Sequence, residues 1–370
     1  MMMDNSTSIL SHQCLHCMTI FESRNKLFKH LSLCFNDSKR QKDSEEVAKD
    51  EEKEDVSTFD LFIIGGRNRG KTLKTCEKLN LGARSEAQEW ARVPAYLINN
   101  RGSHGTTVLG KKIYAMGGGG IKSNLGTLEV LNTSKIMNSW KVLAPMTVSR
   151  HALTAVSTQS GYLFAIGGTT SGNSGYINSE WAQPDKEGNI CCDVVEMYDV
   201  NKDEWSLRAP MRHARRLHGS CVSDGKIYVF GGCCNDPVWF TDKAEVYDPQ
   251  IDAWDDLPCM PYAGEASAVS TIDSSIFVLI HGKGIWLFDP LRLLYKNLGP
   301  LPIVDWHCFC LTTVKHTIFV CGGMEAGKVC KATYSCDTSN LSTEGGIISW
   351  RKEANLAHPG RRSSLVSVER

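Results

Sequence analysis

The sequence predicts an all-β protein whose main domain is a six-bladed β-propeller, because one pattern recurs six times along the chain. In each copy an apolar strand ends in a glycine pair or its remnant, and a second strand and an aromatic residue follow. Successive pairs lie about 50 residues apart, which is near the length of a propeller blade and longer than a helical solenoid repeat. The six positions are Gly65-Gly66, Gly117-Gly118, Gly167-Gly168, Gly231-Gly232, His281-Gly282 and Gly322-Gly323.

The fourth copy shows why these residue types recur. Residues 226–230 form an apolar run that suits a strand buried on both faces between neighbouring blades. Gly231-Gly232 then lets the chain leave that strand in conformations that a side chain would forbid. On the next predicted strand Tyr247 precedes Asp248, a residue well placed to start a tight turn, and Trp254 supplies buried area on the outer strand.

This pattern resembles the kelch repeat, and the resemblance covers about residues 59–370. It implies that partners bind on the face formed by the loops after each glycine pair and the loops leading into each inner strand. The fifth copy departs from the pattern, with His281 in place of the first glycine and Tyr295 in place of the tryptophan.

The two ends of the repeat array predict how the ring closes. The first copy has no apolar strand before residues 60–64, because a charged segment leads directly into them. The last copy has a surplus apolar strand, residues 362–368, after Trp350. We expect this C-terminal strand to complete the first blade, since closure removes the exposed edges that an open array would leave.

A separate module is predicted at residues 12–36, followed by a linker at residues 37–58. The linker is charged and nearly free of apolar residues, which predicts a flexible tether. The module has the ligand spacing of a closed tetrahedral zinc site and resembles a small ββα zinc finger of the Cys-Cys-His-Cys type. We expect one structural zinc ion, which would supply most of the folding free energy of so small a domain. Its predicted ligands are Cys14, Cys17, His30 and Cys34.

The role of this finger stays open at the level of sequence. By analogy with DNA-reading fingers, Ser23, Lys26 and Lys29 would face the bases, but one finger covers only about three base pairs. The same lysines are equally typical of a solvated helix face. Protein contact, a purely structural role and nucleic-acid binding are therefore all retained.

Composition limits the class of protein. The formal net charge is zero, which argues against a general polyanion-binding surface. Neither a long apolar segment nor a signal peptide is evident, so we expect a cytoplasmic or nuclear protein, or one found in both. The 15 cysteines do not indicate a disulfide framework, because the chain is long, lacks an export signal and places many of them in apolar strands. Cys221, Cys310 and Cys321 are expected to be buried thiols that pack like small hydrophobic side chains.

Arginines and two aromatic residues are the predicted partner-binding residues on the loop-bearing face. Guanidinium groups suit the oxygens of carboxylates and phosphates, although any single arginine could instead hold loop carbonyls. Trp181 and Trp239 lie in long loops and are typical of interface anchors. The predicted arginines are Arg67, Arg69, Arg101, Arg150, Arg215, Arg216, Arg361 and Arg362.

These observations favour a protein-interaction module over an enzyme. We expect a substrate-recognition or scaffold subunit, including one of a ubiquitin ligase, that binds an acidic or phosphorylated segment of a partner protein. Many kelch proteins that select ligase substrates carry a BTB domain or an F-box, and neither is recognisable here. A nucleic-acid-associated regulator is the alternative, and a metal-dependent propeller enzyme is the third hypothesis, for which no ligand spacing is found.

Overall fold

The structure is a computed structural model, and it divides the chain into two compact units, Met1–Val56 and Ser57–Arg370. In the first unit, β1 (His12–Gln13) pairs antiparallel with β2 (Ile20–Phe21). The four predicted zinc ligands and residues 37–57 lie outside the described part of the chain. The described residues are 12–13, 20–21, 58–82, 89–120, 123–134, 139–171, 189–233, 240–270, 274–341, 348–358 and 360–370.

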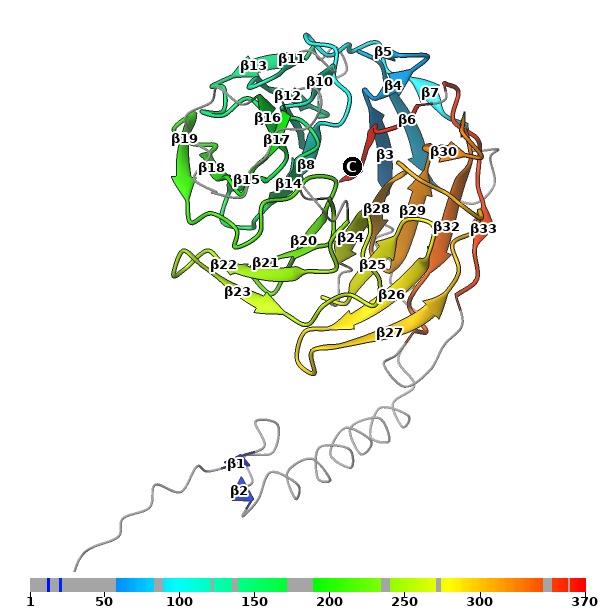
Figure 1. Ribbon diagram of the computed structural model, residues 1–370. Coiled ribbons are helices and arrows are strands. Elements are labelled where there is room, and N and C mark those ends of the chain that lie inside the picture. The colour runs from blue at the N-terminus through cyan, green and yellow to red at the C-terminus, as the bar shows by residue number, and fades with distance from the viewer. Residues whose placement is uncertain are drawn as a thin grey trace, which may run out of the picture. The chain divides into compact units, whose positions relative to one another are not determined.

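The second unit is a six-bladed β-propeller in which each blade is a four-stranded antiparallel sheet (Figure 1). Blade 1 contains β34 (Ser364–Glu369), β3 (Phe59–Ile64), β6 (Cys76–Leu81) and β7 (Ala91–Arg92). Blade 2 contains β8 (Gly105–Leu109), β9 (Lys112–Met116), β12 (Leu128–Asn132) and β13 (Lys141–Leu143). Blade 3 contains β14 (Thr154–Ser157), β15 (Tyr162–Ile166), β18 (Val195–Asp199) and β19 (Glu204–Arg208).

The other three blades repeat this arrangement, with the first strand of each next to the central axis. Blade 4 contains β20 (Gly219–Ser223), β21 (Lys226–Phe230), β22 (Ala244–Asp248) and β23 (Ala253–Leu257). Blade 5 contains β24 (Ala266–Ser270), β25 (Ile276–Ile280), β26 (Gly284–Asp289) and β27 (Leu294–Gly299). Blade 6 contains β28 (Cys310–Val314), β29 (Thr317–Cys321), β32 (Thr333–Asp337) and β33 (Arg351–Lys352).

Short two-stranded ribbons extend from four of the loops that follow the glycine pairs. These ribbons pair β4 (Arg67–Asn68) with β5 (Lys71–Thr72), β10 (Gly119–Gly120) with β11 (Ser123–Asn124), β16 (Thr169–Ser171) with β17 (Asn189–Cys191), and β30 (Met324–Glu325) with β31 (Lys328–Val329). The described residues contain no helix, and thus none that could cross a bilayer.

The predicted ring closure is confirmed. Strand β34 pairs with β3 over the whole length of both strands, from Ser364 opposite Ile64 to Glu369 opposite Phe59. On its other side β34 contacts the inner strands β8 and β28 of the two neighbouring blades. Residues from the end of the chain therefore complete the blade that its first propeller strand begins.

The aromatic residues seen in the sequence fill the outer part of each blade and tie it to its neighbour. Tyr247 packs against Trp254 with ring centroids 5.0 Å apart, and Tyr198 packs against Trp205 at 5.1 Å. Each indole N–H then donates a hydrogen bond of 2.8 Å to a carbonyl that precedes its blade, from Trp254 to Ala209 and from Trp205 to Ala144. Large buried area explains why tryptophan recurs there, and in these two blades the indole N–H is satisfied as well.

The glycine pairs join each blade to the next at one end of the propeller. Gly232 has a φ of 99°, and a Cβ atom there would lie 2.5 Å from the carbonyl oxygen of Arg216, so only glycine fits. Its N–H donates to the carbonyl of Gly264, in the loop that leads into blade 5. Loops after the glycine pairs and loops into the inner strands therefore share one end. We call this end the loop face, and its connecting loops are residues 93–104, 144–153, 209–218, 258–265, 300–309 and 353–363.

The cysteines that the structure describes are free thiols. Cys221, Cys310 and Cys321 are buried in their strands, as the sequence predicted. They pack as small hydrophobic side chains, and burial raises the pKa of the Cys221 thiol well above its ordinary value.

Candidate functional site

Three of the predicted partner-binding arginines are buried, which corrects their assignment. Arg101, Arg150 and Arg215 occupy the same position in the connecting loops that enter blades 2, 3 and 4, and each is 0% exposed. A partner cannot contact a side chain that no solvent reaches. The prediction that these three arginines bind a partner is therefore wrong, and the alternative that they hold loop carbonyls is correct.

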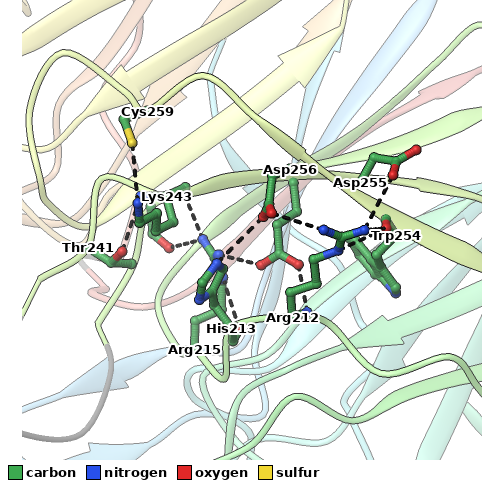
Figure 2. Close-up of polar contacts among 11 residues, drawn as sticks. Arg212, His213, Arg215, Thr241, Lys243, Trp254, Asp255, Asp256 and Cys259 are labelled. Carbon is green, nitrogen blue, oxygen red and sulfur yellow. Dashed lines mark hydrogen bonds and ion pairs between the residues drawn. The ribbon is translucent and has the colours of Figure 1, made fainter.

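Arg215 shows how such a guanidinium is held (Figure 2). Its Nη1 donates to the carbonyl oxygens of Gly231 and Lys243, at 3.0 and 2.7 Å. Its Nη2 donates to Glu245 Oε1 at 2.5 Å, and both charged side chains are fully buried. Because a buried charge is costly unless paired, the arginine and the glutamate depend on each other.

The same latch occurs in the two preceding blades. Arg101 Nη2 lies 2.6 Å from Glu129 Oε1, and Arg150 Nη2 lies 3.0 Å from Glu196 Oε1. Arg101 opposes the cost of burying Glu129, and the pKa of that carboxyl group is lowered overall. We call these three ion pairs the arginine–glutamate latches: Arg101–Glu129, Arg150–Glu196 and Arg215–Glu245.

Each glutamate also accepts backbone hydrogen bonds from its connecting loop. Glu245 Oε2 accepts the N–H of Arg212, and Glu196 accepts the N–H groups of Thr147 and Val148. The latch therefore fixes the connecting loop to the third strand of its blade. These glutamates were not among the predicted site residues, although a glutamate recurs at one position of the third strand in blades 1 to 4.

Blades 5 and 6 replace both partners of the latch together. In blade 5, Gly264 accepts the backbone hydrogen bond that the latch arginines accept in blades 2 to 4, and the third strand, β26, contains no glutamate. In blade 6 the buried Trp306 takes the place of the arginine, and its Nε1 donates to the carbonyl of Gly322 at 2.7 Å. Its ring meets that of Tyr334, which takes the place of the glutamate, edge to face at 5.9 Å.

Blade 1 keeps the glutamate without an arginine. Gly360 stands at the arginine position, and the buried Glu77 instead contacts His358, whose Nδ1 lies 2.6 Å from Glu77 Oε1. The latched blades 2 to 4 and the unlatched blades 5, 6 and 1 thus form two continuous halves of the ring.

Three other predicted arginines come together at blade 1. The backbones of Arg67 and Arg361 exchange two hydrogen bonds, of 2.9 and 3.1 Å, which hold the two residues opposite each other. Burial, and then the charges of Arg362 and Arg361, lower the pKa of Arg67. We call Arg67, Arg361 and Arg362 the arginine cluster, and all three side chains are partly exposed on the loop face.

The arginine cluster carries excess positive charge. Within the described residues, neither Arg67 nor Arg361 forms a salt bridge with a carboxylate. Arg67 Nε is buried and finds no hydrogen-bond partner there either. Burial lowers the pKa of Arg362, but the Cys308 thiol and the Glu265 carboxylate outweigh it and raise that pKa overall. Glu265 thus offsets the charge of Arg362, whereas no described carboxylate pairs with Arg67 or Arg361.

Of the remaining predicted partner-binding residues, the structure describes Arg69 and Arg216. Arg69 is exposed at the turn of the β4–β5 ribbon, and Arg216 is partly exposed, with its backbone paired to Cys233. Both Arg216 and Arg362 oppose the rise in the pKa of the Cys233 thiol, which burial and Glu265 bring to about 12. Trp181 and Trp239 lie outside the described residues.

A cavity of about 200 Å³ lies beside the inner strands, and Arg362 contributes to its lining. Glu265 and His281 also line it, with His281 Nδ1 3.3 Å from Glu265 Oε2. The neighbouring His104 is fully buried, and burial followed by the charge of Arg101 lowers its pKa to about 3. In the part of the chain that the structure describes, His, Cys, Asp and Glu side chains form no group of three that could hold a metal ion.

Comparison with known proteins agrees with this architecture. The Kelch motif model matches residues 100–147 and 214–261, which span most of blades 2 and 4 and the connecting loops before their inner strands. The solved structure of YjhT superposes with a TM-score of 0.60, at 12% sequence identity, and covers 78% of this chain and 96% of that chain. The chain therefore carries kelch repeats in a six-bladed propeller.

Two curated relatives each match more than half of this chain. Kelch-like protein 15 of Danio rerio is 26% identical over 238 residues, which cover 60% of this chain and 36% of the relative. Kelch-like protein 35 of Mus musculus is 25% identical over 287 residues, which cover 77% of this chain and 45% of the relative. The chain thus spans less than half the length of either relative.

Proposed function

We propose that the propeller is a protein-interaction module that binds an acidic segment of a partner protein at the arginine cluster. The observation that carries this proposal is the excess charge at blade 1, where Arg67 and Arg361 face each other without a carboxylate. Guanidinium groups brought together in this way repel one another, and a bound carboxylate or phosphate would relieve that repulsion. The similarity to Kelch-like proteins supports a role in protein interaction.

The geometry makes this a localised site. The backbone hydrogen bonds between Arg67 and Arg361 fix the start of both side chains, so less conformational freedom is lost on binding. Arg101, Arg150 and Arg215 are buried in the latches and cannot contact a partner, so the arginine cluster at blade 1 is the predicted group of neighbouring arginines that remains partly exposed. Arg69 and Arg216 remain accessible on the loop face and would add to the field around the site.

Selection from a library of random dodecapeptides displayed on phage would test this proposal on the full chain. We expect the selected peptides to be enriched in Asp and Glu, and the double variant Arg67→Gln/Arg361→Gln to bind them at least about tenfold more weakly. Arg292→Gln is the matched control, because Arg292 is an exposed arginine on the β26–β27 turn at the opposite end of the blades. Selected peptides without acidic residues, or unchanged binding by the double variant, would contradict the proposal.

A second set of peptides separates the two anion chemistries. Each selected glutamate is replaced in turn by phosphoserine and by glutamine, and binding is measured by fluorescence anisotropy. Tighter binding of the phosphoserine peptides would identify a phosphorylated segment as the ligand, whereas weaker binding would identify carboxylates. The glutamine peptides should bind most weakly in both cases.

Two finer features of the function are also proposals. Cys14, Cys17, His30 and Cys34 would hold one structural zinc ion, which their spacing supports. A role as the substrate-recognition subunit of a ubiquitin ligase is supported by the kelch resemblance alone, and fold-level analogy is a weak argument for function. Recovery of a ligase scaffold with the wild-type protein, and not with Arg67→Gln/Arg361→Gln, would show that the ligase is itself the bound partner. Equal recovery with both proteins would show that the ligase binds elsewhere.

A further inference from the structure

Exposed apolar side chains stand on the two connecting loops that precede the arginine cluster around the ring. Tyr262, in the loop into blade 5, is 50% exposed, and Val304, in the loop into blade 6, is 89% exposed. Both belong to the loop face, as does the arginine cluster. The next connecting loop of the ring leads into blade 1 and contains Arg361 and Arg362.

Anchoring side chains hold both loops in place. The loop of Val304 is fixed by the fully buried Trp306, whose indole N–H bonds to Gly322. The ring of Tyr262 lies 5.7 Å from that of Trp286, and the Lys283 ammonium group lies 5.7 Å from the Tyr262 ring centroid. Large apolar groups held in solvent by buried anchors are typical of a contact surface.

A series of contacts links the loops that carry the apolar residues to the arginine cluster. His307, three residues after Val304, exchanges backbone hydrogen bonds of 3.0 and 2.8 Å with Met324. Arg361 Nη1 in turn lies 3.1 Å from Met324 Sδ. Toward blade 5, the ring of His307 lies 6.4 Å from that of His281, which is two residues before Lys283. We call Tyr262, Val304 and the partly buried Met324 the apolar sector.

We propose that the partner segment has two parts, an acidic residue that binds the arginine cluster and an aliphatic or aromatic residue that packs on the apolar sector. This inference rests on the proposed function, and it specifies which acidic segments bind. Charge pairing at an exposed rim is screened by solvent and salt, so it contributes little affinity by itself. Burying the apolar sector would supply the area-dependent part of binding.

Both parts can be tested with the dodecapeptide selection, repeated on the double variant Tyr262→Ser/Val304→Ser. Against the wild-type protein, we expect peptides that combine an acidic residue with an aliphatic or aromatic residue at a fixed spacing. Against the double variant, the acidic preference should persist while the apolar preference disappears. The best wild-type peptide should bind the double variant at least about tenfold more weakly.

The matched control is Leu291→Ser, because Leu291 is 96% exposed on the β26–β27 turn, at the end of blade 5 opposite the loop face. This variant should bind the wild-type peptide unchanged. Acidic peptides without an apolar preference, or equal binding by Tyr262→Ser/Val304→Ser, would overturn the two-part segment and leave the proposed function standing. Absence of acidic enrichment would overturn the proposed function and this inference together.

Discussion

Replacing Arg215 by methionine would test whether the latch is a structural element. The change removes three hydrogen bonds to carbonyl oxygens, those of His213, Gly231 and Lys243, and the fully buried ion pair with Glu245. Methionine restores much of the volume, so the main cost is the buried glutamate left without its partner. Removal of one partner from such a pair costs about 3 to 5 kcal/mol, which sets the expected loss in the free energy of unfolding.

Arg212 provides the matched control, since it is close in sequence and makes ion pairs in solvent (Figure 2). Its guanidinium contacts Asp255 and Asp256, and about half of the Arg212 side chain is exposed. Arg212→Met should therefore cost only about 1 kcal/mol. Urea unfolding followed by tryptophan fluorescence would compare the two variants with the wild-type protein.

A second substitution in the same blade measures the cost of leaving the Glu245 carboxylate without its partner. Adding Glu245→Gln to Arg215→Met removes the uncompensated carboxylate, while the amide oxygen can still accept the N–H of Arg212. We expect the double variant to be about 1 to 3 kcal/mol more stable than the sum of the single changes predicts. If Arg215→Met unfolds like the wild-type protein and also loses peptide binding, the latch interpretation is refuted and Arg215 reaches the partner.

Three other predictions concern pH, metal and closure. The pKa of His104 is lowered to about 3 in the folded protein, so as pH falls below about 6.5 only the unfolded chain binds a proton at His104, and the folded state loses stability. Between pH 7 and pH 5, His104→Leu should therefore lose roughly 2 kcal/mol less of its unfolding free energy than the wild-type protein loses. An equal loss in the two proteins would contradict this prediction. Elemental analysis of the full chain should find about one zinc ion per molecule, and less zinc in the Cys34→Ala variant. Cys259→Ala, which replaces an exposed free cysteine, is the control and should keep its zinc. Wild-type protein without zinc would refute the predicted zinc site. Deleting residues 361–370 removes β34 and should cause unfolding or aggregation, whereas an unchanged melting temperature would show that the ring does not depend on β34.

Features of the fold that depend on local backbone requirements could be predicted from the sequence. In blades 1 to 4 and 6 the glycine pairs mark positions where a Cβ atom would collide with a neighbouring loop, and each of these copies shows the requirement by itself. The surplus strand at the end of the chain identified closure, because a strand without a partner in its own repeat must pair elsewhere. His281 did not prevent blade 5 from forming, since Gly282 still supplies the left-handed conformation after β25.

The site was harder to predict because arginine exposure depends on its neighbours. Arg150 and Arg361 both stand in loops that enter an inner strand, yet Arg150 is fully buried and Arg361 is partly exposed. The difference is one position in the loop: Arg150 stands at the latch position and pairs with Glu196, whereas Gly360 takes that position in blade 1 and Arg361 follows it. The distance of each arginine from its inner strand, read together with the glutamate of the third strand, separates the two groups.

Pairing of β34 with β3 also determines when the molecule can finish folding. Gly65 and Ser363, which meet at this junction, are 298 positions apart in the sequence. At ordinary translation speeds of about 5 to 20 residues per second, roughly 15 to 60 s separate the synthesis of the two strands. Throughout that interval one edge of β3 has no partner strand, while blades 2 to 6 can already fold. Protection of this edge by a chaperone during synthesis would therefore raise the yield of native protein.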